Sequence, residues 1–197
     1  MLLDPARFAF TVRLEAGVAM FRRELQALTR TDFEPWPDRG AYGGEWLAFP
    51  LFLASHPGDL DRHFASNQAK CQESTAFLRA TKGVVSTGFS WIESGCHIYS
   101  HVDAKPVNLL RAHVGLEVPE GAVMRVGPER HTWTEGKALV FDGYVEHETA
   151  NTARTRRVVL LVDALLEGEE LEYLQAWRRA HGVDVEGALR RGVMMSS

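Results

Sequence analysis

The stretch "HIYSHVDAKPVNLLRAH" (residues 97–113) holds three of the eight histidines of the chain, together with an aspartate and an arginine. Its apolar residues predict two strands, which a Lys-Pro turn separates. Side chains two positions apart on a strand share one face, so His101 lies beside Asp103, and Arg111 lies beside His113. We therefore expect each strand to present one polar pair to a common pocket.

From residue 84 to residue 163 the sequence repeats one pattern of short apolar runs separated by turn residues. Short runs rich in β-branched and aromatic residues alternate with glycine, proline and asparagine, at a spacing of roughly 8–12 residues. The runs cover residues 84–92, 97–102, 108–118, 122–127, 137–143 and 156–163. This spacing is typical of an all-β sandwich or barrel, so we predict a β-barrel or jelly roll with helices packed outside it.

Other elements are expected on both sides of this core. Their apolar periodicity and charge order predict helices at residues 18–28, 73–83 and 168–182 and a strand at residues 45–54. Ser74 is the candidate N-cap of the second helix. Residues 29–46 are too rich in proline and glycine for a regular element and form a loop.

Composition excludes several classes of protein. The 197 residues are 45% hydrophobic, which is enough to build a sizeable core, and a net charge of -4 argues against nucleic acid as a partner. Cys71 and Cys96 are too few for a disulfide framework. No uncharged run reaches the ~18 residues of a membrane span, and the N-terminus has no signal-peptide pattern. We expect a cytoplasmic protein without a membrane partner, and the sequence leaves its oligomeric state open.

A His-x-Asp pair with one distant histidine has the composition of a facial triad. In such a site two histidines and one carboxylate bind non-haem Fe(II) and leave three coordination positions open. His147 is the distant candidate that would join His101 and Asp103. Three ligands are too few for a closed structural zinc site. The His-x-Asp pair also occurs on solvated strands, so this pattern alone leaves a plain polar surface open.

Two longer stretches carry a more specific pattern. Residues 90–121 hold the His-x-Asp pair and then Arg-x-His; residues 133–163 hold Trp-x-x-Gly-Lys, Phe-Asp, His-Glu and an arginine that opens an apolar strand ending in aspartate. In this order the chain resembles the aspartyl/asparaginyl β-hydroxylase family of Fe(II)- and 2-oxoglutarate-dependent dioxygenases. The resemblance implies a mainly β fold, a double-stranded β-helix (a cupin-like jelly roll) with flanking N- and C-terminal α-helices. It implies one dioxygenase domain over residues 1–197, divided into an N-terminal part (1–82), a catalytic core (83–163) and a C-terminal helix with its tail (164–197).

The resemblance also implies roles for residues. His101, Asp103 and His147 would bind Fe(II), and Arg157 would hold the distal carboxylate of 2-oxoglutarate, the cosubstrate that reacts with O₂. Arg156 competes with Arg157 because strand alternation points only one of them inward, and the spacing from His147 favours Arg157. The positions that match the lining of the cosubstrate pocket are Ser90, Arg111 and His113.

Several polar residues keep two interpretations. His97 lies four positions before His101, and on a regular strand it shares that face, where it would orient a ligand or contact substrate. We favour the alternative, a strand histidine that is either satisfied by a hydrogen-bond partner or exposed. Asp142 is a turn residue or an acceptor that orients a ligand histidine, and we favour the structural role. Arg39 and Trp46 are candidates for substrate contact.

The predicted function is an Fe(II)- and 2-oxoglutarate-dependent dioxygenase that hydroxylates a C–H bond and gives succinate and CO₂. The expected substrate is an amino acid or an amino-acid unit with an Asp- or Asn-like side chain, free or in a small peptide or natural product. The alternative is a cupin-type metal-binding protein, an isomerase or a sensor, without 2-oxoglutarate chemistry. A noncatalytic interaction module would be expected to have lost a metal ligand, and this chain keeps all three.

Overall fold

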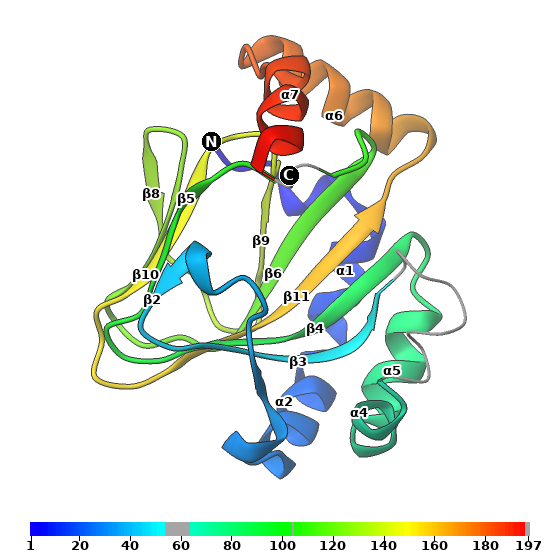
Figure 1. Ribbon diagram of the computed structural model, residues 1–197. Coiled ribbons are helices and arrows are strands. Elements are labelled where there is room, and N and C mark those ends of the chain that lie inside the picture. The colour runs from blue at the N-terminus through cyan, green and yellow to red at the C-terminus, as the bar shows by residue number, and fades with distance from the viewer. Residues whose placement is uncertain (54–63, 104, 196–197) are drawn as a thin grey trace.

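The computed structural model describes residues 1–53, 64–103 and 105–195. Within these residues two antiparallel sheets face each other (Figure 1). The larger sheet has the order β1 (Glu34–Pro35), β3 (Trp46–Leu53), β4 (Val84–Ile92), β11 (Arg157–Leu165), β6 (Leu109–Glu117) and β9 (Ala138–Phe141). The smaller sheet has the order β2 (Tyr42–Gly43), β5 (His97–His101), β10 (His147–Asn151), β7 (Ala122–Val126) and β8 (Glu129–His131). From β4 to β11 the chain passes repeatedly between the sheets, which is the topology of a double-stranded β-helix and confirms the predicted fold.

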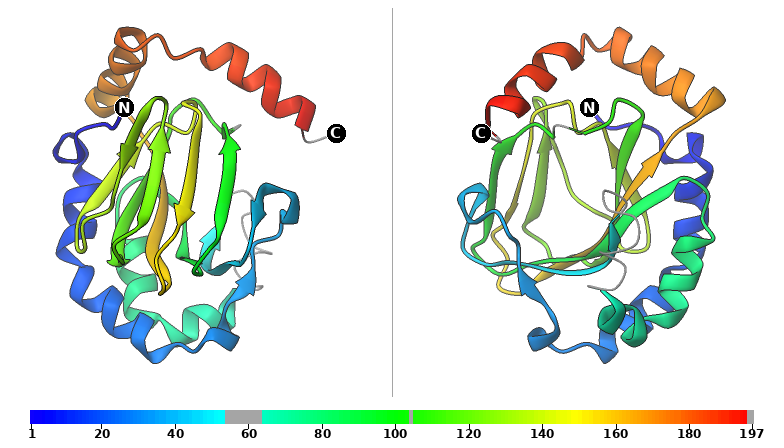
Figure 2. Two further views of the ribbon diagram at one scale, coloured as in Figure 1. Left: turned by 90° about the vertical axis from the view of Figure 1, so that its left-hand side faces the viewer. Right: turned by 45° about the vertical axis from the view of Figure 1, so that its right-hand side comes forward.

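Helices cover the outer face of the larger sheet and one end of the sandwich. They are α1 (Ala9–Ala16), α2 (Val18–Ala27), α4 (Ala65–Lys70), α5 (Gln72–Arg79), α6 (Gly168–Ala180) and α7 (Val185–Met195), with short 3₁₀ turns η1 (Pro5–Arg7), η2 (Arg30–Asp32) and η3 (Arg39–Ala41). In Figure 2, α6 and α7 (orange and red) lie together beyond one end of the strands. None of the helices in the described part of the chain combines the length and apolar character needed to cross a bilayer.

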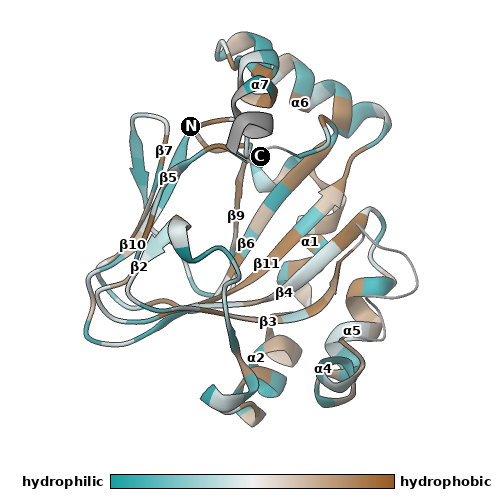
Figure 3. Cartoon of the chain, viewed as in Figure 1, coloured by the Kyte–Doolittle hydropathy of each residue, from teal (hydrophilic) through white to brown (hydrophobic). Residues whose placement is uncertain are grey.

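The core lies on both sides of the larger sheet. Figure 3 shows apolar residues gathered along β11, β6 and β9. Strand β11 lies between β4 and β6 and is buried along almost its whole length. One of its faces meets the smaller sheet and the other meets the helices, which explains why the sequence "RVVLLVDAL" is apolar without alternation.

Most predicted elements are confirmed. The helices at residues 18–28, 73–83 and 168–182 are α2, α5 and α6, and the strand at 45–54 is β3, with Ala54 outside the described residues. The prediction of Ser74 as an N-cap is wrong, because α5 already begins at Gln72. The carboxylate of Glu24 instead accepts hydrogen bonds from the backbone N–H groups of Glu73 and Ser74.

The two strands of residues 97–113 lie in different sheets rather than in one hairpin. Strand β5 pairs with β2 and β10, whereas β6 pairs with β9 and β11. The segment that contains Lys105 and Pro106 is therefore a crossover between the sheets. As a result, the two polar pairs of this stretch approach the interior from opposite walls.

A buried ion pair fixes helix α6 to the loop that follows β9. Arg178 donates from Nε and Nη2 to the two carboxylate oxygens of Asp142, at 2.6 and 2.9 Å, and both side chains are buried. The same guanidinium donates to the carbonyl of Val107 and lies 4.8 Å from the ring of Tyr144. This agrees with a structural role for Asp142, since its carboxylate holds the loop that leads to His147.

Replacing Arg178 with alanine should destabilise the fold by about 3–5 kcal/mol, because it leaves the carboxylate of Asp142 buried without its cation. The neighbouring Arg179 is exposed, so Arg179→Ala is a matched control with an expected effect within about 0.5 kcal/mol. Urea denaturation measures both free energies of unfolding. Equal effects of the two substitutions would contradict the anchoring role of the pair.

Candidate metal centre

The structure brings His101, Asp103 and His147 together. Each of the three side chains offers a ligand atom, and these atoms all lie within 4.8 Å of one another. His101 and His147 face each other as a register pair of β5 and β10, with ring centroids 4.3 Å apart. Asp103 reaches the same point from the start of the crossover, with its Oδ1 atom 4.0 Å from Nε2 of His101. Two imidazoles and one carboxylate at this separation fit a single Fe(II) ion.

Backbone hydrogen bonds orient both imidazole rings. Nδ1 of His101 lies 2.7 Å from the carbonyl of Tyr99, and Nδ1 of His147 lies 2.9 Å from the carbonyl of Val145. A carbonyl only accepts, so Nδ1 carries the proton in each ring and Nε2 keeps its lone pair for a metal. Burial lowers the pKa of His147 to about 4, which keeps this ring neutral at physiological pH.

A bulge in β5 turns His101 inward. His101 pairs with His147, but Ile98 pairs with Thr149, so three steps along β5 match two steps along β10. The extra residue breaks the alternation of the strand. Ile98 and His101 consequently both line the interior although they are three positions apart.

The same bulge places His97 on the outer surface. The expectation that His97 shares the face of His101 is wrong, because it assumed a regular strand. Nε2 of His97 lies 3.1 Å from a carboxylate oxygen of Glu148, in a surface cluster in which Arg125 binds Glu148 and Glu146. This position agrees with the favoured interpretation of a satisfied or exposed strand histidine.

The four predicted cosubstrate residues line one narrow cavity beside His101 and His147. The cavity has a volume of about 30 Å³, and its lining includes Ser90, Arg111, His113 and Arg157 with His101 and His147. Other residues of the lining, which the sequence did not assign to the cosubstrate, are Trp46, Ile98, Met124, Phe141, Thr149 and Leu161. Nε1 of Trp46 donates to Oγ of Ser90 at 3.0 Å, so Trp46, a candidate for substrate contact, borders one of the predicted cosubstrate residues.

Arg157 is a buried cation without an acidic partner among the described residues. It is 1% exposed, forms no salt bridge with any described residue, and its Nε atom has no hydrogen-bond partner there. Its described contacts are a 3.3 Å hydrogen bond from Nη1 to the carbonyl of Ser90 and the ring of Trp133 at 4.6 Å. Burial lowers its pKa to about 9. A guanidinium in this state matches the carboxylate of a bound anion, so the chemistry of the cavity fits 2-oxoglutarate.

Arg156, the competitor of Arg157, points out of the cavity. It donates to both carboxylate oxygens of Glu117 and lies 3.9 Å from the ring of Trp91. The orientation of the two arginines is therefore the one that the spacing from His147 favoured.

His113 and Arg111 differ in their surroundings. Both ring nitrogens of His113 are buried without a described partner, and burial, then Arg157, lowers its pKa well below the ordinary value. Arg111 instead binds two carboxylates, those of Asp103 and Asp163. The predicted contact of Arg111 with 2-oxoglutarate stays a prediction.

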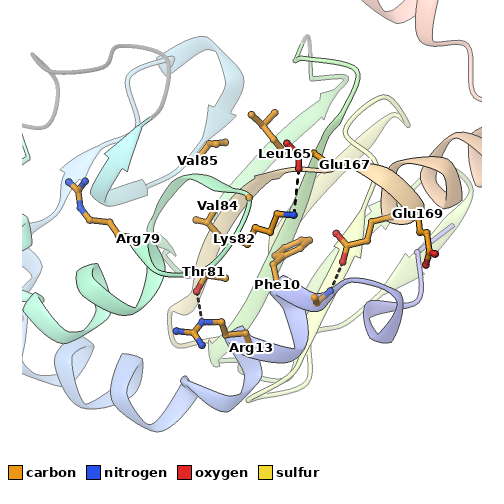
Figure 4. A pocket seen from close by; sticks show the side chains of 13 residues that line it. Phe10, Arg13, Arg79, Thr81, Lys82, Val84, Val85, Leu165, Glu167 and Glu169 are labelled. Atoms are coloured by element: carbon orange, nitrogen blue, oxygen red, sulfur yellow. Dashed lines mark hydrogen bonds and ion pairs between the residues drawn. The ribbon is translucent and has the colours of Figure 1, made fainter.

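The largest cavity described lies elsewhere. It measures about 640 Å³ and opens between α1, the turn after α5 and the start of α6, as Figure 4 shows. Arginine, lysine and glutamate side chains line it, but it contains no histidine and none of the predicted site residues. Chemistry rather than volume therefore identifies the candidate site.

Comparison with known proteins identifies a family. The family model described as "Aspartyl/Asparaginyl beta-hydroxylase" matches residues 15–166, which confirms the resemblance. An ornithine lipid ester-linked acyl 2-hydroxylase of Rhizobium tropici is 40% identical over 101 residues, which cover 49% of this chain and 35% of that protein. The human aspartyl/asparaginyl beta-hydroxylase is 40% identical over 77 residues, which cover 38% of this chain and 10% of that protein. The chain thus spans a minor part of these relatives.

A solved structure supports the fold. The crystal structure of an oxidoreductase of the 2OG-Fe(II) oxygenase family from Burkholderia pseudomallei superposes with a TM-score of 0.50 at 13% sequence identity. The superposition covers 77% of this chain and 80% of that chain. It establishes the double-stranded β-helix as the shared architecture.

A substitution at Gly143 tests whether the carboxylate of Asp103 belongs to the metal site. A Cβ atom added there would lie 2.9 Å from Cβ of Asp103, and the backbone N–H of Asp103 donates to the Gly143 carbonyl at 2.9 Å. Gly143→Ala should therefore displace the carboxylate and weaken metal binding by about 10-fold or more, as measured by Mn²⁺ titration. The control is Gly40→Ala, where the nearest atom would lie at an ordinary 3.4 Å. An unchanged affinity in Gly143→Ala would contradict the assignment.

Acid should destabilise the metal-free protein through His147. The folded pKa is about 4, whereas an unfolded histidine titrates near ~6.5. Between these values the unfolded chain binds the additional proton, so the free energy of unfolding falls as the pH decreases from about 6.5 to about 4. Urea denaturation across this range should give a shallower pH dependence for His147→Gln than for the wild type. Equal slopes would be inconsistent with a buried neutral ring.

Proposed function

The chain belongs to the aspartyl/asparaginyl beta-hydroxylase family, and from this premise we propose that it is an Fe(II)- and 2-oxoglutarate-dependent dioxygenase that hydroxylates a C–H bond. One observation carries the proposal. A cluster of His101, Asp103 and His147 opens onto the same cavity as Arg157, a buried arginine without a described acidic partner. Such a pair of sites provides for a metal ion and for a carboxylate anion beside it.

Each residue has a defined task in this proposal. His101 and His147 bind iron through Nε2, and Asp103 binds it through one carboxylate oxygen. Arg157 holds the distal carboxylate of 2-oxoglutarate, because its planar donors match a carboxylate. Fe(II) and 2-oxoglutarate bound by these residues would supply the oxidative chemistry: O₂ and 2-oxoglutarate would give succinate and CO₂, with one oxygen atom of O₂ in succinate and the other inserted into a C–H bond of the substrate.

Aromatic side chains pack around these polar groups. Phe141 lies edge-on to His113 at 5.1 Å and tilted to His147 at 4.9 Å. Trp46 closes the cavity beside Ser90 and stacks on Trp36 at 3.9 Å. Burial among apolar rings strengthens the attraction between Arg157 and a carboxylate.

For the substrate we propose a methylene group bonded to a carbonyl carbon, in an amino acid or an amino-acid unit with an Asp- or Asn-like side chain. The reactions named for the relatives support hydroxylation at this carbon. The β-carbon of Asp or Asn and the 2-carbon of an acyl chain are both bonded directly to a carbonyl-type carbon. The substrate can be free or part of a small peptide or natural product, and acyl lipids form the competing class in the test.

We propose a cytoplasmic location and no nucleic-acid partner. The net charge of -4 supports the second point, and two free buried cysteines are compatible with a reducing compartment. We also propose that residues 1–197 act as one dioxygenase domain. Support comes from α1, α2, α4 and α5, which pack directly on strands of the larger sheet.

The metal and cosubstrate roles are tested anaerobically. Protein loaded with Fe(II) and 2-oxoglutarate should give a weak visible charge-transfer band, and admission of O₂ should give succinate. His101→Ala should abolish both signals. A band that is unaffected by this substitution would overturn the assignment of the metal site.

Arg157 separates the dioxygenase from the cupin-type alternative. Arg157→Met should raise the KM for 2-oxoglutarate by about 100-fold, since a charged hydrogen-bonded contact of about 3 kcal/mol is lost. Arg156→Met is the matched control, because Arg156 points outward to Glu117. The KM of this variant for 2-oxoglutarate should stay close to the wild-type value. An unchanged KM in Arg157→Met would favour a metal protein without 2-oxoglutarate chemistry.

Substrate class is tested with a panel. Succinate formation should rise in the presence of Asp, Asn or short peptides that contain them, and the product should carry one hydroxyl next to the carbonyl carbon. Stimulation by acyl lipids alone would overturn the amino-acid assignment while leaving the reaction class intact.

A further inference from the structure

We propose that Asp163 is a positioning residue for the metal centre and acts through Arg111 on the iron-binding carboxylate. Asp163 lies on β11 directly opposite Arg111 on β6, is 2% exposed, and is not part of the cavity lining. It therefore contacts neither the metal position nor the cosubstrate cavity. This inference rests on the proposed function, since it concerns how Asp103 is presented to iron.

Arg111 bridges the two aspartates. Its Nε and Nη2 atoms donate to the two carboxylate oxygens of Asp163, at 2.7 and 2.9 Å. Its Nη1 atom lies 2.7 Å from Oδ2 of Asp103. The other oxygen of Asp103, Oδ1, is the one that faces His101. The bidentate pair with Asp163 thus fixes the guanidinium, and the guanidinium leaves one oxygen of Asp103 for the metal.

Charge explains why Asp163 is needed. The three ligands supply one negative charge, that of Asp103, because both histidines bind as neutral rings. Arg111 lies at hydrogen-bond distance from this charge and would offset the attraction of the site for a dication. Asp163 is a second buried negative charge on the other side of the same guanidinium, so it compensates for the cation.

Lys105 completes the row of charges at its outer end. Its Nζ atom donates to Oδ2 of Asp163 at 2.6 Å, and its side chain is about one-third exposed. Lys105, Asp163, Arg111 and Asp103 therefore alternate in sign and sum to zero. Loss of Asp163 leaves this row with a net positive charge, whereas loss of Lys105 leaves it with a net negative charge.

The two arginines that line the cavity consequently have separate tasks. Arg111 is occupied by two carboxylates and serves the metal ligand, whereas Arg157 has no described acidic partner and is left for the cosubstrate. This division differs from the expectation that Arg111 contacts 2-oxoglutarate, and it predicts that substitutions in the two branches affect different ligands.

The experiment measures Mn²⁺ affinity without 2-oxoglutarate, by electron paramagnetic resonance of the free ion, and then 2-oxoglutarate affinity of the Mn²⁺-loaded protein. Asp163→Asn should raise the Kd for Mn²⁺ by about 10- to 100-fold. Arg157→Met should leave the Kd for Mn²⁺ within about twofold and weaken 2-oxoglutarate binding. Lys105→Gln breaks the same hydrogen bond as Asp163→Asn but changes the charge in the opposite direction, so its Kd for Mn²⁺ should be equal to or below that of the wild type.

Each outcome is decisive. A role of Asp163 in packing alone would make both Asp163→Asn and Lys105→Gln bind Mn²⁺ more weakly, and this would overturn the proposal. An unchanged Kd for Mn²⁺ in Asp163→Asn would overturn it too. Failure of the wild type to bind Mn²⁺ would instead refute the proposed function. If Asp163→Asn does not fold, as judged by near-UV circular dichroism, Lys105→Gln still tests the proposal because Lys105 is partly exposed. A rise of about tenfold in the Kd of Lys105→Gln for Mn²⁺ would contradict the charge argument.

Discussion

The balance of buried charge between the two sheets is the constraint on which the site depends. A buried ion is costly unless it is paired, and this sandwich buries two arginines near one point. Arg111 is neutralised by Asp103 and Asp163, and this pairing defines where the carboxylate ligand sits. Arg157 has no acid among the described residues, so its charge is available for an anion. We propose that Arg111 positions the metal-binding carboxylate and that Arg157 binds the carboxylate of the cosubstrate.

Strand geometry places the remaining groups around these charges. The bulge in β5 turns His101 toward His147, and the crossover after β5 carries Asp103 to the same point. The loop before β10 is held from outside by the pair of Asp142 with Arg178 of helix α6. The candidate site thus draws on both sheets and on helix α6, although the three proposed metal ligands all lie within residues 83–163.

Much of the fold could be predicted because hydrophobic periodicity and turn residues are local signals. The runs that became β4, β6 and β11 were placed within about two residues, as expected for strongly patterned strands. Strand β10, with its sequence "HETAN", was missed because it is short and polar. The candidate site residues are predicted from an ordered motif, but the face of His97 is not predictable in this way, since a bulge leaves no signal in the sequence. The pairing of Arg111 with Asp163 was also missed, because cross-strand register is not encoded locally.

In the proposed function, O₂ and 2-oxoglutarate react at the histidine–aspartate cluster beside the buried Arg157. Turnover under ¹⁸O₂, followed by mass spectrometry of the succinate, tests this reaction. We expect succinate that carries one ¹⁸O atom in the wild type and no labelled succinate in His101→Ala. Succinate without label, or labelled succinate that persists in His101→Ala, would refute the proposed reaction.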